Sequence, residues 1–516
     1  GWLRVGLRGL TKGNDKNNFF GRGATVEVRA GSGYQYREVD RQTTHFGLGG
    51  RRRADNLRVV WANGVPQNRI HPQGEQTIVE EQQLKGSCPF LYTWNGERIE
   101  FVTDLLWNAP LGMPVAPGVW AASDPRELVR IDGAVPRPTG TGSGAEIDLR
   151  ITEELWEAAY FDRTRLWVVD HPEGTELTSS LRVFARIPEG FRFDEPRAIR
   201  APRPVAAAWD GDGREVTARV AARDEVYADG YPVGDYQGVT PLPWALTFDL
   251  GEAPAAPIRL VLDGWIFPAD ASLNLAVAQR NDLGHHPLTA LEMLTDEGWA
   301  TLLDPMGFPA GKTKTMVVDV PELPPGVSKL RVRTSRWLHW DRIAWTPLGR
   351  QVDAEAVVVA RRAPDRAELR YRGFSRMYRE APNAPHRYLY DEVTTDSPWQ
   401  PAGGRYTGYG DVLDLLTEVD DRLVVMAPGD EIALSFAVGA LPAPAAGMQR
   451  TYLLESWGWD KDFDRNTWEA TSAQPLPFSG MDGYPFSSPR RESAAEHAER
   501  HRRLTRAGVA ESGSDR

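Results

Sequence analysis

The densest group of potential metal ligands in this chain is the stretch Asp460-Lys461-Asp462-Phe463-Asp464-Arg465-Asn466-Thr467-Trp468-Glu469. It carries oxygen donors at alternate positions, and a tight loop of this kind suits calcium, a hard cation that takes about six to eight oxygen ligands. Three carboxylates this close would repel one another without a cation. The stretch therefore predicts calcium as a cofactor, with the ligands Asp460, Asp462, Asp464, Asn466 and Glu469.

A solvated acidic turn is the alternative interpretation of the same stretch. The glycine of an EF-hand loop is replaced by Arg465, and Thr471 stands where the bidentate glutamate would be. Lys461 and Arg465 would then neutralise part of the negative charge. Both interpretations stay open at the level of sequence.

Tryptophans form the second group of candidate binding residues. Residues 257–345 have the strand rhythm of a jelly-roll sandwich and include Trp265, Trp299, Trp337 and Trp340. Sugars stack their C–H faces on exposed indoles, so a glycan-binding module would expose some of these four side chains on one face. The alternative is that Trp337, Trp340 and Trp345 are partly core aromatics, because aromatic side chains dominate burial in β-sandwiches.

Signals for catalysis are few. Glu153 and Glu154 lie near Asp162, but adjacent residues of a strand point to opposite faces, so the two glutamates cannot act as a pair on one substrate. His285-His286 is the one histidine pair, and it lacks a third metal ligand at a suitable spacing. The sequence contains no Gly-x-Ser-x-Gly, His-Glu-x-x-His, P-loop or dinucleotide motif, so we predict no catalytic residue.

Composition limits the classes of protein and partner. The 516 residues carry a net charge of -11, which argues against a nucleic-acid partner because phosphate binding needs a concentrated positive surface. The sequence contains no run of eighteen apolar residues, so it predicts no membrane-spanning helix. Cys88 is the single cysteine, so no internal disulfide is possible and stability must come from packed cores.

Alternating apolar and polar residues, as in 24–30 and 330–334, predict strands through most of the chain. Turn pairs such as Asn95-Gly96 separate them. We therefore expect a mainly β, multidomain fold: a small N-terminal β domain followed by β-sandwich units of jelly-roll or immunoglobulin type. Changes in composition place the units at 1–81, 87–200, 207–346 and 349–486, followed by a charged tail, 487–516, that we expect to be disordered.

The N-terminal segment resembles a known module. Gly21-Arg22-Gly23-Ala24-Thr25-Val26-Glu27-Val28, Thr44-His45-Phe46-Gly47-Leu48-Gly49 and Leu57-Arg58-Val59-Val60-Trp61-Ala62-Asn63-Gly64 follow the order and spacing of the ASPIC/UnbV module. This module ends cartilage-acidic-protein-like extracellular proteins. The match departs at Ala62-Asn63, where proline and a small residue are usual.

The resemblance extends, more loosely, to the region that follows such modules in large bacterial secreted proteins. The phrases that carry it include residues 101–106, 152–158 and 307–312. The resemblance implies an extracellular or periplasmic location. It also implies that this chain is a C-terminal fragment, whose full-length protein would carry an FG-GAP/VCBS propeller domain upstream.

These features predict an extracellular binding or adhesion module that recognises a glycan or a surface protein. One alternative is a hydrolase, or an accessory subunit of an enzyme that acts on polysaccharides or in natural-product biosynthesis. Another is a structural assembly subunit. An exposed row of tryptophans would favour glycan binding, a deep pocket with two convergent acids would favour an enzyme, and a flat apolar patch would favour assembly.

Overall fold

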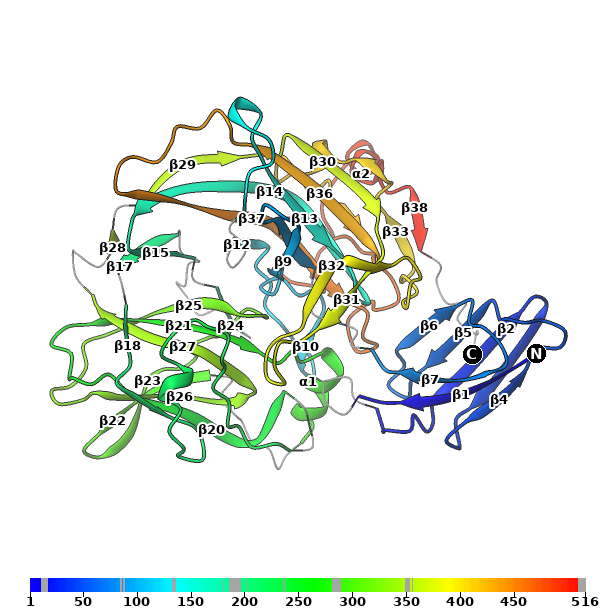
Figure 1. Cartoon of the computed structure of the whole chain (residues 1–516), viewed down its shortest axis with the longest axis horizontal. Helices are drawn as coiled ribbons and strands as arrows, with labels where there is room; N and C mark the ends of the chain where they lie inside the picture. Colours follow the sequence, from blue (N-terminus) through cyan, green and yellow to red (C-terminus); the bar gives the residue numbers. More distant parts are fainter. Residues whose placement is uncertain are drawn as a thin grey trace.

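The computed structural model describes most of the chain, and its elements are almost all strands (Figure 1). The residues described are 1–10, 17–83, 86, 89–131, 136–179, 181–184, 196–200, 202–234, 236, 238–280, 289–348, 353–354 and 356–508. Strands account for 49% of the residues and helices for 5%, which confirms the predicted mainly β, multidomain class. No helix in the described part of the chain has the length and apolar character that crossing a membrane requires.

The N-terminal unit consists of two small sheets (Figure 1). One contains β4 (Thr44–Gly47), β1 (Trp2–Arg8) and β7 (Gln76–Glu81), and the other contains β3 (Gly33–Glu38), β2 (Thr25–Ala30), β5 (Asn56–Val60) and β6 (Pro66–Ile70). Val26 and Val28 of β2 are buried while Glu27 between them is only half-buried, as the alternating sequence predicts. Trp61 closes the core of this unit.

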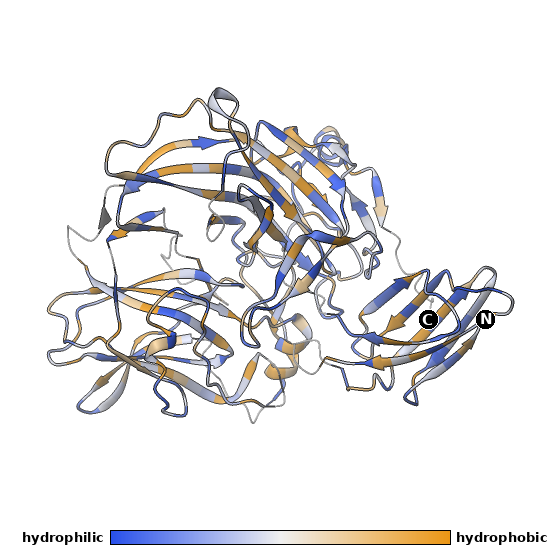
Figure 2. Cartoon of the chain, in the orientation of Figure 1, coloured by the Kyte–Doolittle hydropathy of each residue, from blue (hydrophilic) through white to orange (hydrophobic). Residues whose placement is uncertain are grey.

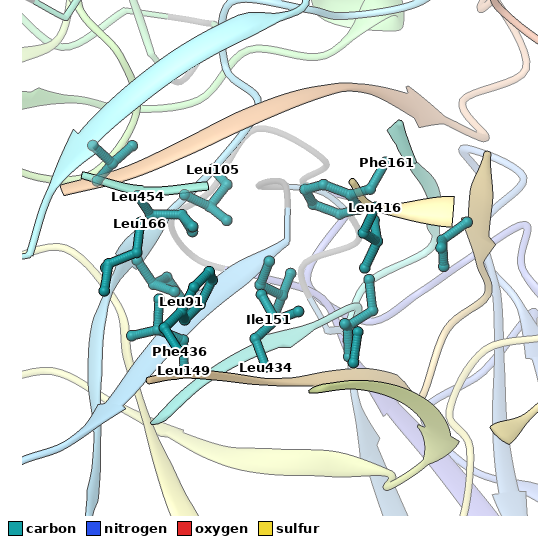
Figure 3. Close-up of a cluster of buried hydrophobic side chains, with 14 of the residues drawn as sticks. Leu91, Leu105, Leu149, Ile151, Phe161, Leu166, Leu416, Leu434, Phe436 and Leu454 are labelled. Atoms are coloured by element: carbon teal, nitrogen blue, oxygen red, sulfur yellow. The ribbon is translucent and has the colours of Figure 1, made fainter. Parts of the chain in front are cut away.

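Next along the chain is a large sandwich of two sheets. The first sheet contains β12 (Arg126–Arg130), β37 (Met448–Asp462), β14 (Glu157–Pro172) and β29 (Val357–Arg362), with β35 (Val424–Met426) also paired to β14. The second contains β34 (Gly410–Asp411), β30 (Arg366–Tyr371), β36 (Asp430–Ala437), β13 (Glu146–Thr152), β8 (Phe90–Trp94) and β9 (Ile99–Asp104). Figure 3 shows the apolar side chains that fill the space between them, including Leu91, Phe161 and Leu434.

This sandwich revises the domain division expected from sequence. Residues 87–200 and 349–486 were expected to be separate units, yet β14 pairs along its whole length with β37, and β13 pairs with β36. The two segments therefore share both sheets and one core, and the unit between them in sequence is an insertion. Local alternation shows which side chains face inward, but it does not specify which strands pair.

The inserted unit is a second sandwich. One sheet contains β18 (Arg203–Pro204), β27 (Leu338–Pro347), β21 (Ile258–Ile266) and β25 (Lys314–Val320), and the other contains β19 (Ala207–Trp209), β20 (Val239–Asp249), β26 (Lys329–Arg336), β22 (Thr289–Thr295) and β23 (Gly298–Leu303). Its core includes Leu262, Trp340 and Trp345. Helix α1 (Ala271–Ala278) follows β21 and is capped by the side chain of Asp270.

Several of the remaining described elements are short. They are β10 (Pro114–Ala116) with β11 (Val119–Trp120), β15 (Thr175–Thr178) with β17 (Arg197–Arg200) and β28 (Asp353–Ala354), β16 (Arg182–Val183) with β24 (Phe308–Pro309), the hairpin β31 (Phe374–Tyr378) and β32 (Arg387–Thr394), and the 3-10 turns η1 (Gly142–Gly144), η2 (Thr217–Arg219) and η3 (Leu413–Leu415). Figure 2 shows apolar and polar residues alternating along many of the strands.

The C-terminal segment up to residue 508 is ordered, contrary to the disordered tail expected from sequence. Helix α2 (Ala494–His501) begins with a capping box between Ser493 and Glu496, and β38 (Arg506–Gly508) pairs with β33 (Gly404–Tyr406). Arg506 forms an ion pair with buried Asp430 at 2.5 Å. The charges that made the tail look solvated therefore anchor it to the large sandwich.

Candidate functional site

A cleft of about 280 Å³ opens between the large sandwich and the inserted unit. Its walls come from β9 and β12 of the sandwich, from the loop before β25 and from β27 of the inserted unit, and from the start of β32. Among the described residues, the lining includes five basic side chains and two acidic ones: Arg130, Arg223, Lys312, Lys314 and Arg387, with Glu225 and Asp341. Threonine and serine residues also line the cleft, and the hydroxyl of one of them, Thr103, donates to Asp104 at 3.3 Å.

Asp104, at the end of β9, fixes one wall of this cleft. Its carboxylate is fully buried and accepts hydrogen bonds from the backbone N–H of Lys312 at 3.1 Å and from Nε1 of Trp107 at 2.7 Å. It also forms a buried ion pair with Lys314, whose ammonium donates to the carbonyl of Ala310 at 2.6 Å. The loop of the inserted unit is thereby tied to a strand of the sandwich.

Gly311 makes this close approach possible. Its φ of +83° lies in the left-handed region, and a Cβ there would be 2.2 Å from Nε1 of Trp107 and 2.4 Å from Oδ2 of Asp104. The phrases 101–106 and 307–312, far apart in sequence, meet at this contact. Neither segment identifies the cleft by its sequence; the cleft is recognised only from the contact between the two segments in the structure.

Two basic side chains are held in place on the cleft. The ammonium of Lys312 lies 5.4 Å from the ring centre of Phe90 and 5.5 Å from that of Tyr388, within the range of cation–π attraction. Nη2 of Arg387 donates to Glu225 at 2.7 Å, which orients the guanidinium at the rim. Both groups are therefore positioned before any ligand arrives.

The two acids of the cleft have different partners. Asp341 is fully buried, and its Oδ1 accepts hydrogen bonds from the backbone N–H groups of Asp224 and Glu225 at 3.1 and 2.8 Å. Burial raises the pKa of Asp341 to about 6. Glu225, in contrast, forms an ion pair with Arg387 at the rim. The cleft therefore offers hydrogen-bonding groups and cations, several of which already pair with acids of the chain.

The four tryptophans predicted to bind a ligand are not brought together on an exposed face. Trp265, Trp337 and Trp340 are 5% exposed or less, whereas Trp299 is half-buried beneath the guanidinium of Arg331. The ring of Trp265 stacks on His339, with ring centres 4.0 Å apart. The first three are therefore core aromatics, as the alternative interpretation held for Trp337 and Trp340, and these three positions do not form an exposed row.

The predicted calcium loop is not one loop. Strand β37 extends to Asp462 and pairs with the start of β14, so Asp460 and Asp462 lie on one face of a sheet. Lys461 lies on the opposite face, where its ammonium donates to the carbonyl of Ser472 at 2.8 Å and burial lowers its pKa to about 7.

The other predicted ligands lie in the turn that follows the strand. Asp464 accepts hydrogen bonds from the hydroxyl of Ser272 and from the backbone N–H of Asn466, both at 2.8 Å. The side-chain amide of Asn466 also donates to Ser272, and Glu469 is exposed. Asp464 and Asn466 thus fasten the turn to helix α1.

Asp460 joins two other acids instead. Asp460, Glu153 and Glu157 are all buried, and one carboxylate oxygen of each lies within 4.8 Å of the others. Burial and the nearby Glu157 raise the pKa of Glu153 well above its ordinary value. Sequence analysis identified Asp460 as a ligand but not Glu153 and Glu157, because they are distant in sequence and only the pairing of β14 with β37 unites them.

Glu154 points away from this group. It accepts hydrogen bonds from the hydroxyls of Tyr92 at 3.0 Å and Thr152 at 2.8 Å, and it forms an ion pair with Arg372 at 3.3 Å. Glu153 and Glu154 thus occupy separate environments. The histidine pair His285-His286 lies outside the described residues.

Comparison with known proteins places the N-terminal unit in a family. The chain is a multidomain β protein with a small β unit at its start, and residues 13–85 match the family described as ASPIC and UnbV. The N-terminal unit therefore contains an ASPIC/UnbV domain, and β2 to β7 lie within the matched segment.

Beyond this family the comparisons add little. No curated protein matches the chain. Among solved structures, the cryo-EM structure of the arabinofuranosyltransferase AftD from mycobacteria aligns with 85% of this chain and 30% of that chain, at 12% identity and a TM-score of 0.14. A likeness at this TM-score carries no argument about fold or function.

Proposed function

We propose that this protein is an extracellular binding module whose cleft recognises an acidic glycan, a sugar that bears a carboxylate or a sulfate. The observation that carries the proposal is the excess of basic over acidic side chains on the described walls of the cleft. A hydrogen bond from a cationic side chain to an anionic ligand is about twice as strong as a hydrogen bond between neutral groups.

The basic side chains are preorganised, which favours binding. Arg130 is held by Glu176 at 3.1 Å and Arg387 by Glu225 at 2.7 Å. Glu176 is not among the described residues that line the cleft, whereas Glu225 is. Because these side chains are already ordered, they lose less conformational entropy when a ligand binds. The cleft volume, about 280 Å³, lies just below the usual range for small-molecule pockets, about 300 to 1,000 Å³, and suits a single sugar unit.

The location and the biological partner belong to the same proposal. The extracellular or periplasmic location comes from the resemblance of residues 21–64 to modules of secreted proteins. A glycan on a cell surface or in a matrix would supply repeated acidic sugars, so several weak sites together would give adhesion. A surface protein that presents such a glycan is a partner of the same kind.

The test is titration calorimetry of the full chain with glucuronate, and with glucose as its uncharged counterpart. We expect glucuronate to bind and glucose not to bind. Arg387→Gln removes one charge-assisted hydrogen bond, worth about 1.5 to 3 kcal/mol, so glucuronate affinity should fall roughly 10-fold or more. The control is Arg376→Gln, which removes an exposed arginine that pairs with Glu392 on the same hairpin and lies outside the cleft lining.

The control variant should bind glucuronate like the parent protein. Equal affinities of the Arg387→Gln and parent proteins would remove the cleft from the proposal. Both glucuronate and a sulfated sugar, glucose 6-sulfate, should be tested at about 10 mM, which is tenfold above a Kd of ~1 mM. If neither binds at that concentration, the acidic-glycan proposal is wrong.

A further inference from the structure

We propose that Glu153, Glu157 and Asp460 bind a calcium ion inside the large sandwich. This site is separate from the cleft, and it differs from the loop site expected from sequence because it retains only Asp460 of the predicted ligands. Its ligands come from three places in the fold: the connection after β13, the start of β14 and the end of β37.

Strand register directs two of these side chains to the same place. Ala159 pairs with Asp460 and Glu157 pairs with Asp462, so Glu157 and Asp460 are diagonal neighbours on one face of the sheet. This face carries Ala159 and Phe161 into the main core, which explains why the acids are buried. The fold therefore places carboxyl groups at the end of an apolar core.

The oxygen separations suit one ion. Calcium binds oxygen at about 2.3 to 2.6 Å, so two of its ligands are at most about 5 Å apart. The three carboxylates each offer an oxygen within 4.8 Å of the others, which is inside this limit. Carboxylate oxygens are also the donors that calcium prefers, and calcium tolerates an irregular, largely dehydrated site better than magnesium does.

A second observation comes from the hydrogen bonds of Glu153. This side chain has no solvent exposure, and its Oε1 accepts a hydrogen bond from the backbone N–H of Leu155 at 3.1 Å. Its Oε2 has no hydrogen-bond partner in the part of the chain that the structure describes. A buried carboxylate oxygen without a partner is costly, and a cation held by all three acids would satisfy it.

The same strand supplies a fourth carboxylate beside the site. Asp462 is buried opposite Glu157, and its Oδ1 accepts the backbone N–H of Asp464 at 2.9 Å. Glu157, Asp460 and Asp462 also take part in other polar or electrostatic interactions, so the inference rests on the geometry of the three oxygens and on Glu153. A bound ion would join both sheets at this end of the sandwich.

The experiment measures calcium binding to the full chain after EDTA treatment and removal of the chelator. We expect calorimetry to give one calcium per chain and the melting temperature to rise with calcium chloride but not with magnesium chloride at the same concentration. A hundredfold excess of calcium over Kd corresponds to about 2.7 kcal/mol of added stability. Glu153→Gln keeps the size of the side chain and an acceptor for Leu155, and it should lower calcium affinity at least 10-fold.

The matched control is Asp464→Asn, which changes the acid that faces Ser272 in the turn. The Asp464→Asn protein should still bind calcium. If Asp464→Asn instead loses calcium binding while Glu153→Gln keeps it, the calcium site is the loop expected from sequence. The Glu153→Gln protein should keep the circular dichroism spectrum of the parent in calcium-free buffer, which separates loss of binding from misfolding. A parent protein that neither binds calcium nor gains stability from it would overturn the inference, and glucuronate binding would be unaffected by that result.

Discussion

Lys314→Met should destabilise the contact between the large sandwich and the inserted unit. Methionine is similar in length to the aliphatic stem of lysine, but it lacks the ammonium that pairs with Asp104. Asp104 has no solvent exposure and the side chain of Lys314 is 4% exposed, so water cannot replace the lost partner. The remaining carboxylate would be a buried charge with less compensation.

The expected cost follows from the contacts that remain. Removing one member of a buried ion pair costs about 3 to 5 kcal/mol. Asp104 keeps the N–H groups of Lys312 and Trp107, which places Lys314→Met near the lower end, at about 3 kcal/mol. Asp104→Asn should cost a similar amount, because it leaves the Lys314 ammonium buried without its carboxylate.

The double substitution separates charge from packing. Oδ2 of Asp104 accepts from both Lys312 and Trp107, and an asparagine oxygen in that position would keep both bonds. The double variant Asp104→Asn with Lys314→Met leaves neither a carboxylate nor an ammonium buried without its partner. We therefore expect the double variant to cost at least about 2 kcal/mol less than the sum of the two single variants.

Urea unfolding followed by tryptophan fluorescence measures these free energies, and Trp107 lies at the contact itself. Circular dichroism at the same urea concentrations tests whether the two sandwiches unfold together, as the comparison of free energies requires. A cost below about 1 kcal/mol for Lys314→Met, or costs that simply add in the double variant, would show that the buried pair is not what holds the two units together.

Two other predictions follow from the same structure. In urea unfolding, Gly311→Ala should lower the free energy of unfolding by at least about 2 kcal/mol more than Gly174→Ala does. Both glycines have a positive φ, but a Cβ at residue 311 would overlap Trp107, whereas nothing lies within 4 Å of a Cβ at residue 174. Equal costs for the two substitutions would refute the close approach at Gly311. Asp162 is buried and its pKa is raised to about 7, so the folded state holds a proton there that the unfolded state releases above pH 4. Stability from this group is present at low pH and is lost as the pH rises toward 7, by about 1.4 kcal/mol per pH unit. Asp162→Asn should remove this slope, and unfolding measured from pH 4 to 8 with an unchanged slope would contradict it.

Local sequence determined much of this fold. Alternation in segments such as 24–30 predicted strands with the observed inward faces, because the side chains of a strand point alternately to its two sides whatever it pairs with. The motifs of residues 21–64 identified the ASPIC/UnbV domain. The stretch around Asp460 was recognised as acidic and crowded from its composition alone.

Tertiary structure alone decided the rest. Strand pairing joined 87–200 to 349–486, and the same pairing brought Glu153 and Glu157 to Asp460 and turned Asp464 toward Ser272. The charged C-terminal segment was ordered by its ion pair with Asp430. Which strands pair, and which acids then share a buried space, depends on how the whole chain buries its apolar surface at once, and that information is not contained in any short segment.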